Sequence, residues 1–275
     1  MSKAMQLKAR IKNLASKNRV PAQAVLQNFM LERLLERISL SKYKDMVILK
    51  GGMLIASMVG ISSRTTMDMD ATLRGYPLTE KAIQEALSEI CAIPLGDEVS
   101  LELDHITPIR EDDDYGGFRV AIIAKYESIN TPLKIDITTG DIITPDAIRY
   151  AFQSNFENKK IEVWAYNIET ILAEKVETIL RRSVLNTRPR DYYDVYIIMK
   201  TQRRAINKNL FRTALNATAQ KRTSLAALKE QDIILQSIQT DTIMRQRWER
   251  YCKENYYANG IEFDVVIGIL KELVS

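Results

Sequence analysis

Residues 49–75 are LKGGMLIASMVGISSRTTMDMDATLRG, a mostly apolar stretch that also contains two adjacent glycines and two closely spaced aspartates. An apolar run precedes Gly51 and Gly52 and predicts a short strand, and the segment MLIASMV after them predicts a short helix. The next segment, TMDMDATL, alternates in polarity and predicts a second strand. The chain is therefore expected to turn tightly at the glycines and to return as a strand that carries both aspartates.

Asp68 and Asp70 are predicted to project from one face of that strand, because residues two apart share a face and lie roughly 7 Å apart. Met67 and Met69 are expected on the opposite face, toward the core. Two neighbouring carboxylates repel each other and favour a cation between them, and Mg²⁺ suits such a pair. Asp136 in the apolar run LKIDI is a candidate third carboxylate from a neighbouring strand, for two metals about 4 Å apart.

The glycine pair is suited to phosphate binding. A strand that ends in two glycines and opens a helix lets backbone N–H groups approach a phosphate, and the helix dipole favours negative charge there. Taken alone, Gly51 and Gly52 are more typical of a plain turn than of a phosphate site, and an Asp-x-Asp pair is weak evidence for a metal site. The signal becomes specific when the glycines, the aspartates, Arg64 and Thr66 are combined.

The composition is that of an ordinary globular protein, with 46% hydrophobic and 27% charged residues in a chain of 275. No stretch approaches the ~20 apolar residues that cross a bilayer, and the basic start lacks the apolar run of a signal peptide. Cys91 and Cys252 have no metal-site spacing, which indicates a reduced, cytoplasmic protein. A single histidine, His105, excludes most histidine-based nucleophilic and zinc chemistry.

The first 150 residues mix helices with strands. Residues 3–40 predict two helices, and residues 78–93 predict an amphipathic helix with Thr79 as its N-cap. Three runs that predict strands follow: EVSLELDHITPI, FRVAIIAKY and PLKIDITTG. The acidic run Glu111–Asp114 lies beside two glycines and predicts a solvated turn between the first two strands.

The later part of the chain is mainly helical in pattern. NIETILAEKVETILRR predicts a helix capped by Asn167, and PRDYYDVYIIMK predicts another with Pro189 in its first turn. The two patterns together predict an α+β fold. We expect a mixed sheet with flanking helices over residues 1–150 and a helical domain over residues 151–275.

Residues 181–222 carry a strong positive charge. Eleven Lys or Arg stand against two Asp, a net charge of +9, so the remainder of the chain carries −5 of the total of +4. A local field of this size favours a polyphosphate or nucleic-acid partner. A solubilising helical surface is the simple alternative.

Three segments together resemble the AbiEii/AbiGii toxin family, nucleotidyltransferase-fold proteins of bacterial abortive-infection systems. The first segment, KGG followed by RTTMDMD, matches the first motif of the family at Gly51, Gly52, Arg64, Thr66, Asp68 and Asp70. ETILAEKVETILRR matches the Ala-x-Lys helix at Lys175, and RPRDYYDV matches the Arg-Asp-x-x-Asp segment at Arg190, Asp191 and Asp194. The departure is Gly-Gly-Met, where broader nucleotidyltransferases have Gly-Ser.

The resemblance implies a nucleotidyltransferase that moves NMP from an NTP to an acceptor and releases pyrophosphate. It implies Mg²⁺ or Mn²⁺ as the cofactor and GTP as the NTP. The implied catalytic residues are Asp68, Asp70, Lys175 and Asp191. The implied nucleotide-binding residues are Gly51, Gly52, Arg64, Thr66, Lys175 and Arg190. The implied metal ligands are Asp68 and Asp70, and Asp136 is the third metal ligand expected from the strand pattern.

The motif residues of the helical half have individual interpretations. Lys175 supplies a point charge suited to a triphosphate, although without the motif it would be interpreted as a surface lysine. Asp191 either orients Lys175 or acts as a base for the incoming hydroxyl. Arg190 and Tyr192 are candidates to stack on or bind the nucleotide. The apolar positions around them, Tyr193, Val195 and Ile198, are expected in the core.

The resemblance also implies a toxin that arrests bacterial growth and is encoded beside an AbiEi-type antitoxin. The +9 segment favours RNA, such as tRNA, as the acceptor, since phosphate contacts supply much of nucleic-acid affinity. Transfer to a small molecule or a protein is an alternative, as is an NTP- or RNA-binding module without turnover. A metal-dependent nuclease is a further alternative, but it leaves the glycine pair and Lys175 without a use.

Overall fold

The computed structural model describes residues 2–109 and 116–275 of the chain. The acidic run Glu111–Asp114, predicted as a solvated turn, lies outside the described residues. Within the described ranges, no helix combines the length and the apolar character that a membrane span requires.

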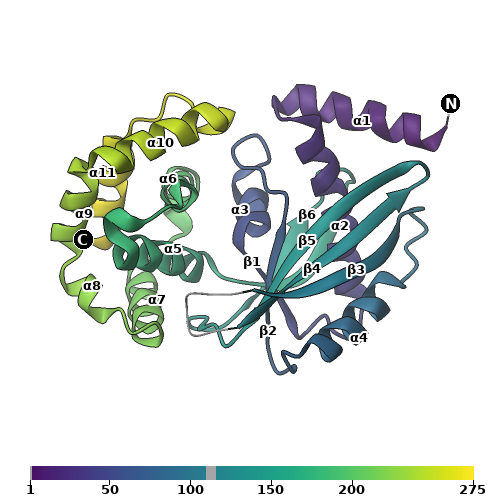
Figure 1. Cartoon of the computed structure of the whole chain (residues 1–275), viewed down its shortest axis with the longest axis horizontal. Coiled ribbons are helices and arrows are strands. Elements are labelled where there is room, and N and C mark those ends of the chain that lie inside the picture. Colours follow the sequence, from purple (N-terminus) through teal and green to yellow (C-terminus); the bar gives the residue numbers. More distant parts are fainter. Residues whose placement is uncertain (1, 110–115) are drawn as a thin grey trace. The chain divides into compact units, whose positions relative to one another are not determined.

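The chain divides into two compact units. Unit 1 comprises Met1–Asp141 and Ile148–Ala165, and unit 2 comprises Ile142–Ala147 and Tyr166–Ser275. The predicted α+β class is confirmed, because a mixed sheet with flanking helices is followed by a helical part (Figure 1). The domain limits predicted near residue 150 stay a prediction, since compactness alone does not show which segments fold independently.

Unit 1 is built on a seven-stranded sheet with the order β3-β4-β5-β2-β1-β7-β6. The strands are β1 (Val47–Lys50), β2 (Met69–Leu73), β3 (Ser100–Ile109), β4 (Gly117–Tyr126), β5 (Ile129–Thr139), β6 (Ile148–Gln153) and β7 (Lys160–Ala165). β2 is antiparallel to β1 and parallel to β5, and β1 is parallel to β7. β6 and β7 form an antiparallel hairpin that the sequence patterns did not predict.

The helices that flank this sheet are α1 (Lys3–Asn18), α2 (Ala22–Leu40), α3 (Gly51–Val59) and α4 (Glu80–Cys91). Alternation in β2 separates the two faces, since Met69, Ala71 and Leu73 are buried on one side while Asp70 projects to the other. Thr79 caps α4 as predicted, accepting a hydrogen bond from the backbone of Ala82.

The β6–β7 hairpin is attached to α2 by a buried carboxylate. Glu32 is fully buried and accepts hydrogen bonds from Ser154 Oγ at 2.6 Å and from the Asn155 backbone N–H at 3.0 Å. Burial raises the pKa of Glu32, although these donors oppose the shift. The hairpin therefore depends on a satisfied buried polar contact.

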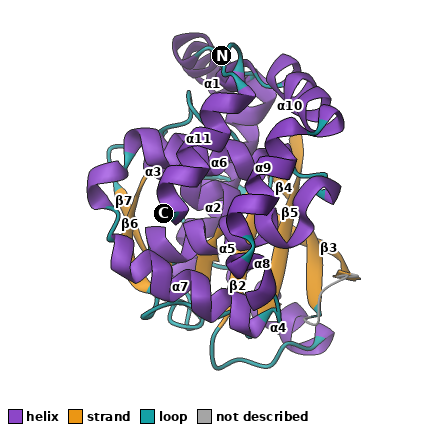
Figure 2. Cartoon of the chain, turned by 90° about the vertical axis from the view of Figure 1, so that its left-hand side faces the viewer, coloured by secondary structure: helices purple, strands orange, loops and turns teal. Residues whose placement is uncertain are grey.

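Unit 2 is a bundle of helices (Figure 2). Its members are α5 (Ile168–Arg182), η1 (Ser183–Leu185), α6 (Pro189–Thr201), η2 (Arg203–Ala205), α7 (Lys208–Lys221), α8 (Leu225–Lys229), α9 (Gln231–Thr240), α10 (Thr242–Glu254), η3 (Tyr256–Ala258) and α11 (Phe263–Val274). α5 contacts both α6 and α7 and buries Leu172, Val176 and Ile179. Asn167 caps α5 as predicted, accepting from Thr170 N at 2.8 Å.

Candidate active site

Four charged residues form a row across four neighbouring strands of unit 1. The register places Lys50 of β1 opposite Asp70 of β2, and Asp70 opposite Asp136 of β5. Asp136 in turn lies opposite Arg119 of β4. Laterally paired residues point to the same face of a sheet, so this charged row presents two carboxylates side by side between two cations.

Asp136 lies beside Asp70 on the neighbouring strand, where the sequence pattern placed a third carboxylate. Arg119 Nε donates to Asp136 Oδ1 at 2.8 Å, and Arg119 Nη2 donates to Asp136 Oδ2 at 2.7 Å. Both oxygens of Asp136 thus accept from one guanidinium in a two-pronged ion pair.

The glycine pair brings the start of α3 against Asp70. Gly51 has φ +64°, and a Cβ at this position would lie 1.9 Å from Asp70 Oδ2. The Gly52 N–H donates to Asp70 Oδ2 at 3.2 Å. A glycine is required at position 51 for both its backbone angle and this close approach. One N–H expected to face phosphate is thus bonded to Asp70.

The carboxylate of Asp70 is under electrostatic stress. Burial raises its pKa to about 6, and the charges of Asp68 and Asp136 add to the shift. Lys50 and the Gly52 N–H oppose the shift without cancelling it. The centre of the charged row is therefore short of positive charge.

Asp68 lies just before β2, which begins at Met69. Thr66 is 2% exposed, and its Oγ1 donates to Asp68 Oδ1 at 2.5 Å, so that Thr66 orients this carboxylate. The prediction that Met67 and Met69 both face the core is wrong for Met67, which is 49% exposed. Strand alternation governs only residues inside the strand, and Met67 lies outside it.

Arg64 lies beneath the glycine turn. Its side chain is 1% exposed, and it donates through Nη1 to the backbone carbonyl of Thr65. A Cβ at Gly52 would lie 2.8 Å from Thr66 Oγ1 and 3.1 Å from Arg64 Nη2. Arg64 and Thr66 therefore pack directly against the turn from the inside.

The sequence patterns missed a polar cluster at the edge of the charged row. Lys50 Nζ donates to Asp141 Oδ2 at 2.6 Å and to Thr138 Oγ1 at 2.8 Å. Although burial opposes it, Lys50 lowers the pKa of Asp141. The sequence position of Lys50 could have revealed this cluster, because a lysine ends an apolar strand directly before the glycines.

The residues around Asp70 fit a divalent cation in their chemistry. Asp68, Asp70 and Asp136 offer the oxygen ligands that Mg²⁺ and Mn²⁺ prefer, in a region with excess negative charge. In the part of the chain that the structure describes, no three acidic, histidine or cysteine side chains are arranged to hold a metal. A cation at Asp136 would compete with the positive charge of Arg119 for this carboxylate.

A second ionic group, the lysine cluster, lies in unit 2. Lys175 Nζ lies 2.6 Å from Asp191 Oδ1 and 3.0 Å from Asp194 Oδ2. The side chain of Lys175 is 20% exposed and that of Asp194 is 0% exposed, so Lys175 is not a surface lysine. Burial alone would lower the pKa of Lys175, but the two carboxylates more than offset it and raise the pKa. Its ammonium group is held charged.

Helix α6 supplies both carboxylates of the lysine cluster. Asp191 and Asp194 are three residues apart and therefore share a helix face. The sequence patterns assigned no role to Asp194, although this spacing was visible. Arg190, beside them, is exposed.

Tyr192 is 1% exposed, and its ring lies 5.8 Å from that of Phe263. The interpretation of Tyr192 as a nucleotide-stacking residue is therefore wrong, because helix periodicity turns it into the bundle. The expectation that Tyr193, Val195 and Ile198 lie in the core is confirmed, since they are at most 1% exposed.

The basic segment 181–222 is partly engaged inside unit 2. Arg222 lies 2.7 Å from Glu177 and 3.3 Å from Glu174, and Arg181 lies 3.0 Å from Glu177. The exposed members are Arg188, Arg190, Lys200, Arg203, Arg204, Lys208 and Arg212. The positive surface is therefore smaller than the sequence alone suggests.

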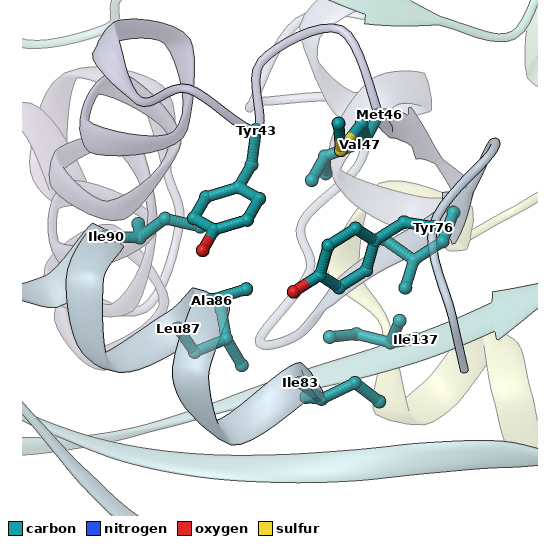
Figure 3. A pocket seen from close by; sticks show the side chains of 10 residues that line it. Tyr43, Met46, Val47, Tyr76, Ile83, Ala86, Leu87, Ile90 and Ile137 are labelled. Atoms are coloured by element: carbon teal, nitrogen blue, oxygen red, sulfur yellow. The ribbon is translucent and has the colours of Figure 1, made fainter. Parts of the chain in front are cut away.

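A small hollow lies on the other face of the sheet, between β1, β2, β5 and α4. Figure 3 shows Tyr43 and Tyr76 on two of its sides, with Ile83 and Leu87 of α4 beside them. Its lining consists of apolar side chains and two tyrosines. A polyphosphate needs cationic or N–H donors, so this hollow is unsuited to a nucleotide.

Comparison with solved structures supports the fold. The chain is similar to MenT4, a nucleotidyltransferase toxin from Mycobacterium tuberculosis H37Rv, with 13% identity and a TM-score of 0.57. This match covers 96% of the chain and 99% of MenT4. The structure of JHP933 from Helicobacter pylori matches at 15% identity and a TM-score of 0.49, over 92% of the chain and 91% of JHP933.

Among curated proteins, no sequence is similar enough to count as a match. The family comparison is decisive, because a model described as nucleotidyl transferase AbiEii toxin, type IV toxin–antitoxin system, matches residues 33–267. The resemblance seen in the sequence motifs is thereby confirmed. The chain belongs to the AbiEii family of nucleotidyltransferase toxins from type IV toxin–antitoxin systems.

Proposed function

We propose that this chain is an NTP- and metal-dependent nucleotidyltransferase that transfers NMP to RNA and thereby arrests growth. The observation that carries the proposal is the stressed carboxylate of Asp70 in β2, which lies against the first residues of α3. Burial and the charges of Asp68 and Asp136 raise its pKa to about 6. A site built this way favours a bound cation, and it lies where a Gly-Gly turn opens a helix.

The reaction exchanges the α–β phosphoanhydride bond of the NTP for a phosphodiester bond to the acceptor. An acceptor hydroxyl oxygen attacks the α-phosphorus, the bond from that phosphorus to the β-bridging oxygen breaks, and pyrophosphate leaves with the oxygen. The hydroxyl proton passes to a base or to water. A divalent cation held by Asp68, Asp70 and Asp136 would supply charge neutralisation for the leaving group and activation of the hydroxyl.

The glycine turn is proposed to contact the triphosphate through backbone N–H groups of α3. Gly51 and Gly52 are proposed to allow the close approach, and the Gly52 N–H would have to be shared between Asp70 and a phosphate oxygen. The burial of Arg64 and Thr66 favours a supporting role, in which they fix the turn and orient Asp68.

Lys175 is proposed to bind phosphate, with Asp191 orienting it rather than acting as a base. The ion pair with Asp191 at 2.6 Å supports this assignment, because a carboxylate committed to an ammonium group is a poor base. Two carboxylates around one lysine leave the lysine cluster with a net charge of −1. We therefore expect Lys175 to contribute a directed N–H donor more than a long-range attraction. Arg190 is proposed as a further nucleotide contact because it is exposed beside Asp191.

RNA is the proposed acceptor because the exposed arginines and lysines of segment 181–222 fit a phosphate backbone. We propose GTP as the NTP and tRNA as the RNA, because the resemblance to the family implies them. The family also implies an antitoxin partner, and we propose one of the AbiEi type. The proposed site of action is the cytoplasm.

The test is incubation of the purified chain with Mg²⁺, total RNA and each α-³²P-labelled NTP in turn. We expect label in an RNA band, dependent on Mg²⁺ and abolished in the Asp68→Asn variant. Label in protein, or in a small molecule supplied by a cell extract, would replace RNA as the acceptor. No label in any fraction, with intact NTP binding, would favour a binding module instead.

A further inference from the structure

Arg119 engages both oxygens of a candidate metal ligand in the charged row, with donor–acceptor distances of 2.8 and 2.7 Å to Asp136. Its side chain is 49% exposed, whereas that of Asp136 is 21% exposed. The guanidinium thus lies at the solvent side of the pair and is able to change partner. Because the guanidinium is half exposed, solvent screens this ion pair and lowers the cost of exchanging its partner.

A cation bound between Asp70 and Asp136 would be repelled by the guanidinium of Arg119, which donates to both oxygens of Asp136. The guanidinium, once displaced, is planar and two-pronged, and this geometry fits a phosphate as well as a carboxylate. The negative triphosphate that accompanies the cation supplies such a partner. Binding of the cation together with the triphosphate therefore takes Asp136 from Arg119 and supplies a phosphate group as its new partner.

We propose that Arg119 is a nucleotide-binding residue that pairs with Asp136 when the site is empty and with the triphosphate when NTP and metal are bound. This inference rests on the proposed function, since it assumes an NTP site at the charged row. In the empty state Arg119 competes with the divalent cation for Asp136. In the loaded state it holds the triphosphate.

Lys125 provides a matched control on the same strand. It is six residues from Arg119 and so shares its face of β4, and it pairs with Glu102 of β3. Its side chain is 40% exposed, close to the value for Arg119. Because its ion pair lies away from the charged row, Lys125→Ala removes one positive charge without freeing Asp136.

The first measurement is Mn²⁺ binding to the full chain without nucleotide, followed by the electron paramagnetic resonance signal of free Mn²⁺. We expect Arg119→Ala to bind Mn²⁺ about two- to fivefold more tightly than the wild type, as removal of an exposed ion pair allows. Lys125→Ala is expected to match the wild type. Thermal unfolding of each variant checks that the fold is retained.

The second measurement is binding of the α,β-methylene analogues of GTP and ATP in the presence of Mn²⁺. We expect Arg119→Ala to bind the preferred analogue about tenfold more weakly, because it removes a charge-assisted, two-pronged hydrogen bond. Arg119→Lys keeps the charge but lacks the fork, so it is expected to recover only part of this affinity.

The combined outcomes decide between the proposals. Arg119→Ala with wild-type affinity for Mn²⁺ and for the analogue would overturn the inference and leave the proposed function standing. Weaker Mn²⁺ binding in Arg119→Ala would also overturn it, by showing a structural role. Full recovery of the analogue affinity in Arg119→Lys would overturn the two-pronged contact, by showing that Arg119 contributes only its positive charge. A wild-type chain that binds neither Mn²⁺ nor either analogue would remove the proposed function and this inference together.

Discussion

The charged row of unit 1 and the lysine cluster of unit 2 are built from the same kinds of side chain but in different arrangements. In the charged row, two carboxylates are neighbours, and the pKa of Asp70 rises to about 6. In the lysine cluster, one ammonium lies within 3.0 Å of two carboxylates, and its pKa also rises. The first arrangement leaves a carboxylate poorly compensated, and the second holds a lysine firmly charged.

This difference assigns different roles to the two regions. A ligand of opposite charge lowers the electrostatic energy of a poorly compensated carboxylate, so the charged row is suited to binding a cation. A compensated buried pair resists change, because removing one partner leaves the other buried and unpaired. The lysine cluster is thus expected to hold geometry as well as to contact a substrate.

The largest expected effect is the loss of transfer when the charged row is altered. Asp70→Asn and Asp68→Ala should each lower nucleotidyl transfer by at least about a hundredfold, as removal of a group that stabilises the transition state does. Growth inhibition should disappear with it. The measurement is labelled transfer in vitro and growth at equal expression. Wild-type growth inhibition in either variant would show that these aspartates are not the metal-binding residues.

The two regions should differ next in stability. Lys175→Ala should lower the free energy of unfolding by about 3 kcal/mol, because it removes the ammonium group that pairs with the buried carboxylates of Asp191 and Asp194. Asp70→Asn should be at least as stable as the wild type, because it relieves repulsion between carboxylates. Urea unfolding compares the two variants. Equal destabilisation by both changes would remove the distinction between the regions.

Lys175 also permits a test of its proposed contact with phosphate. Lys175→Ala should weaken NTP binding strongly, and Lys175→Arg should recover only part of it, because the guanidinium fork is larger than an ammonium. Fluorescence titration with a labelled NTP measures both. Unchanged NTP affinity in Lys175→Ala would limit the lysine cluster to a structural role.

The glycine turn offers a smaller effect with a close control. Gly51→Ala should destabilise unit 1 by about 2 kcal/mol or more, since positive φ alone costs roughly 1–2 kcal/mol and the new Cβ also overlaps Asp70. Gly75 has nearly the same φ, +65° against +64°, with no atom within 4 Å of its Cβ position. Gly75→Ala should therefore cost only the backbone term. Equal melting temperatures for the two variants would contradict the close packing of Gly51 on Asp70.

The smallest effect is expected at the basic surface. Arg203→Glu, Arg204→Glu and Lys208→Glu together should weaken RNA binding and make its salt dependence shallower. The slope should fall by roughly 0.7–0.9 log units per log unit of salt for each RNA phosphate that the variant no longer neutralises. NTP binding should be unchanged.

The matched control for this surface reverses three exposed lysines of α1, Lys8, Lys12 and Lys17, for the same change in net charge. Equal RNA affinity and equal salt slope in the two triple variants would make segment 181–222 a solvated or antitoxin-binding face.

Local features of the fold were predictable from the sequence because their causes are local. Thr79 and Asn167 cap their helices as predicted, since a capping side chain acts on residues two or three positions away. The glycine turn and the strand of Asp70 were predictable for the same reason. The exposure of Met67 was not predictable, because pairing with a neighbouring strand decides the residue at which a strand begins, and β2 begins only at Met69.

The partners of the site residues were less predictable because they depend on register between distant strands. Arg119 meets Asp136 only through the pairing of β4 with β5, and Lys50 meets Asp141 across 91 residues of sequence. No periodicity encodes such contacts. Tyr192 was predicted wrongly for a related reason. Its position in the motif suggested contact with a ligand, but packing of the helical bundle buries it.

The central claim is that the charged row supports nucleotidyl transfer, and paired labels test it most directly. The chain is supplied with RNA, Mg²⁺ and the active NTP labelled in one reaction at the α-phosphate and in the other at the γ-phosphate. The account predicts α label joined to RNA, γ label released as pyrophosphate, and neither event in Asp70→Asn. Transfer of the γ label to RNA, or equal transfer by Asp70→Asn, would contradict it.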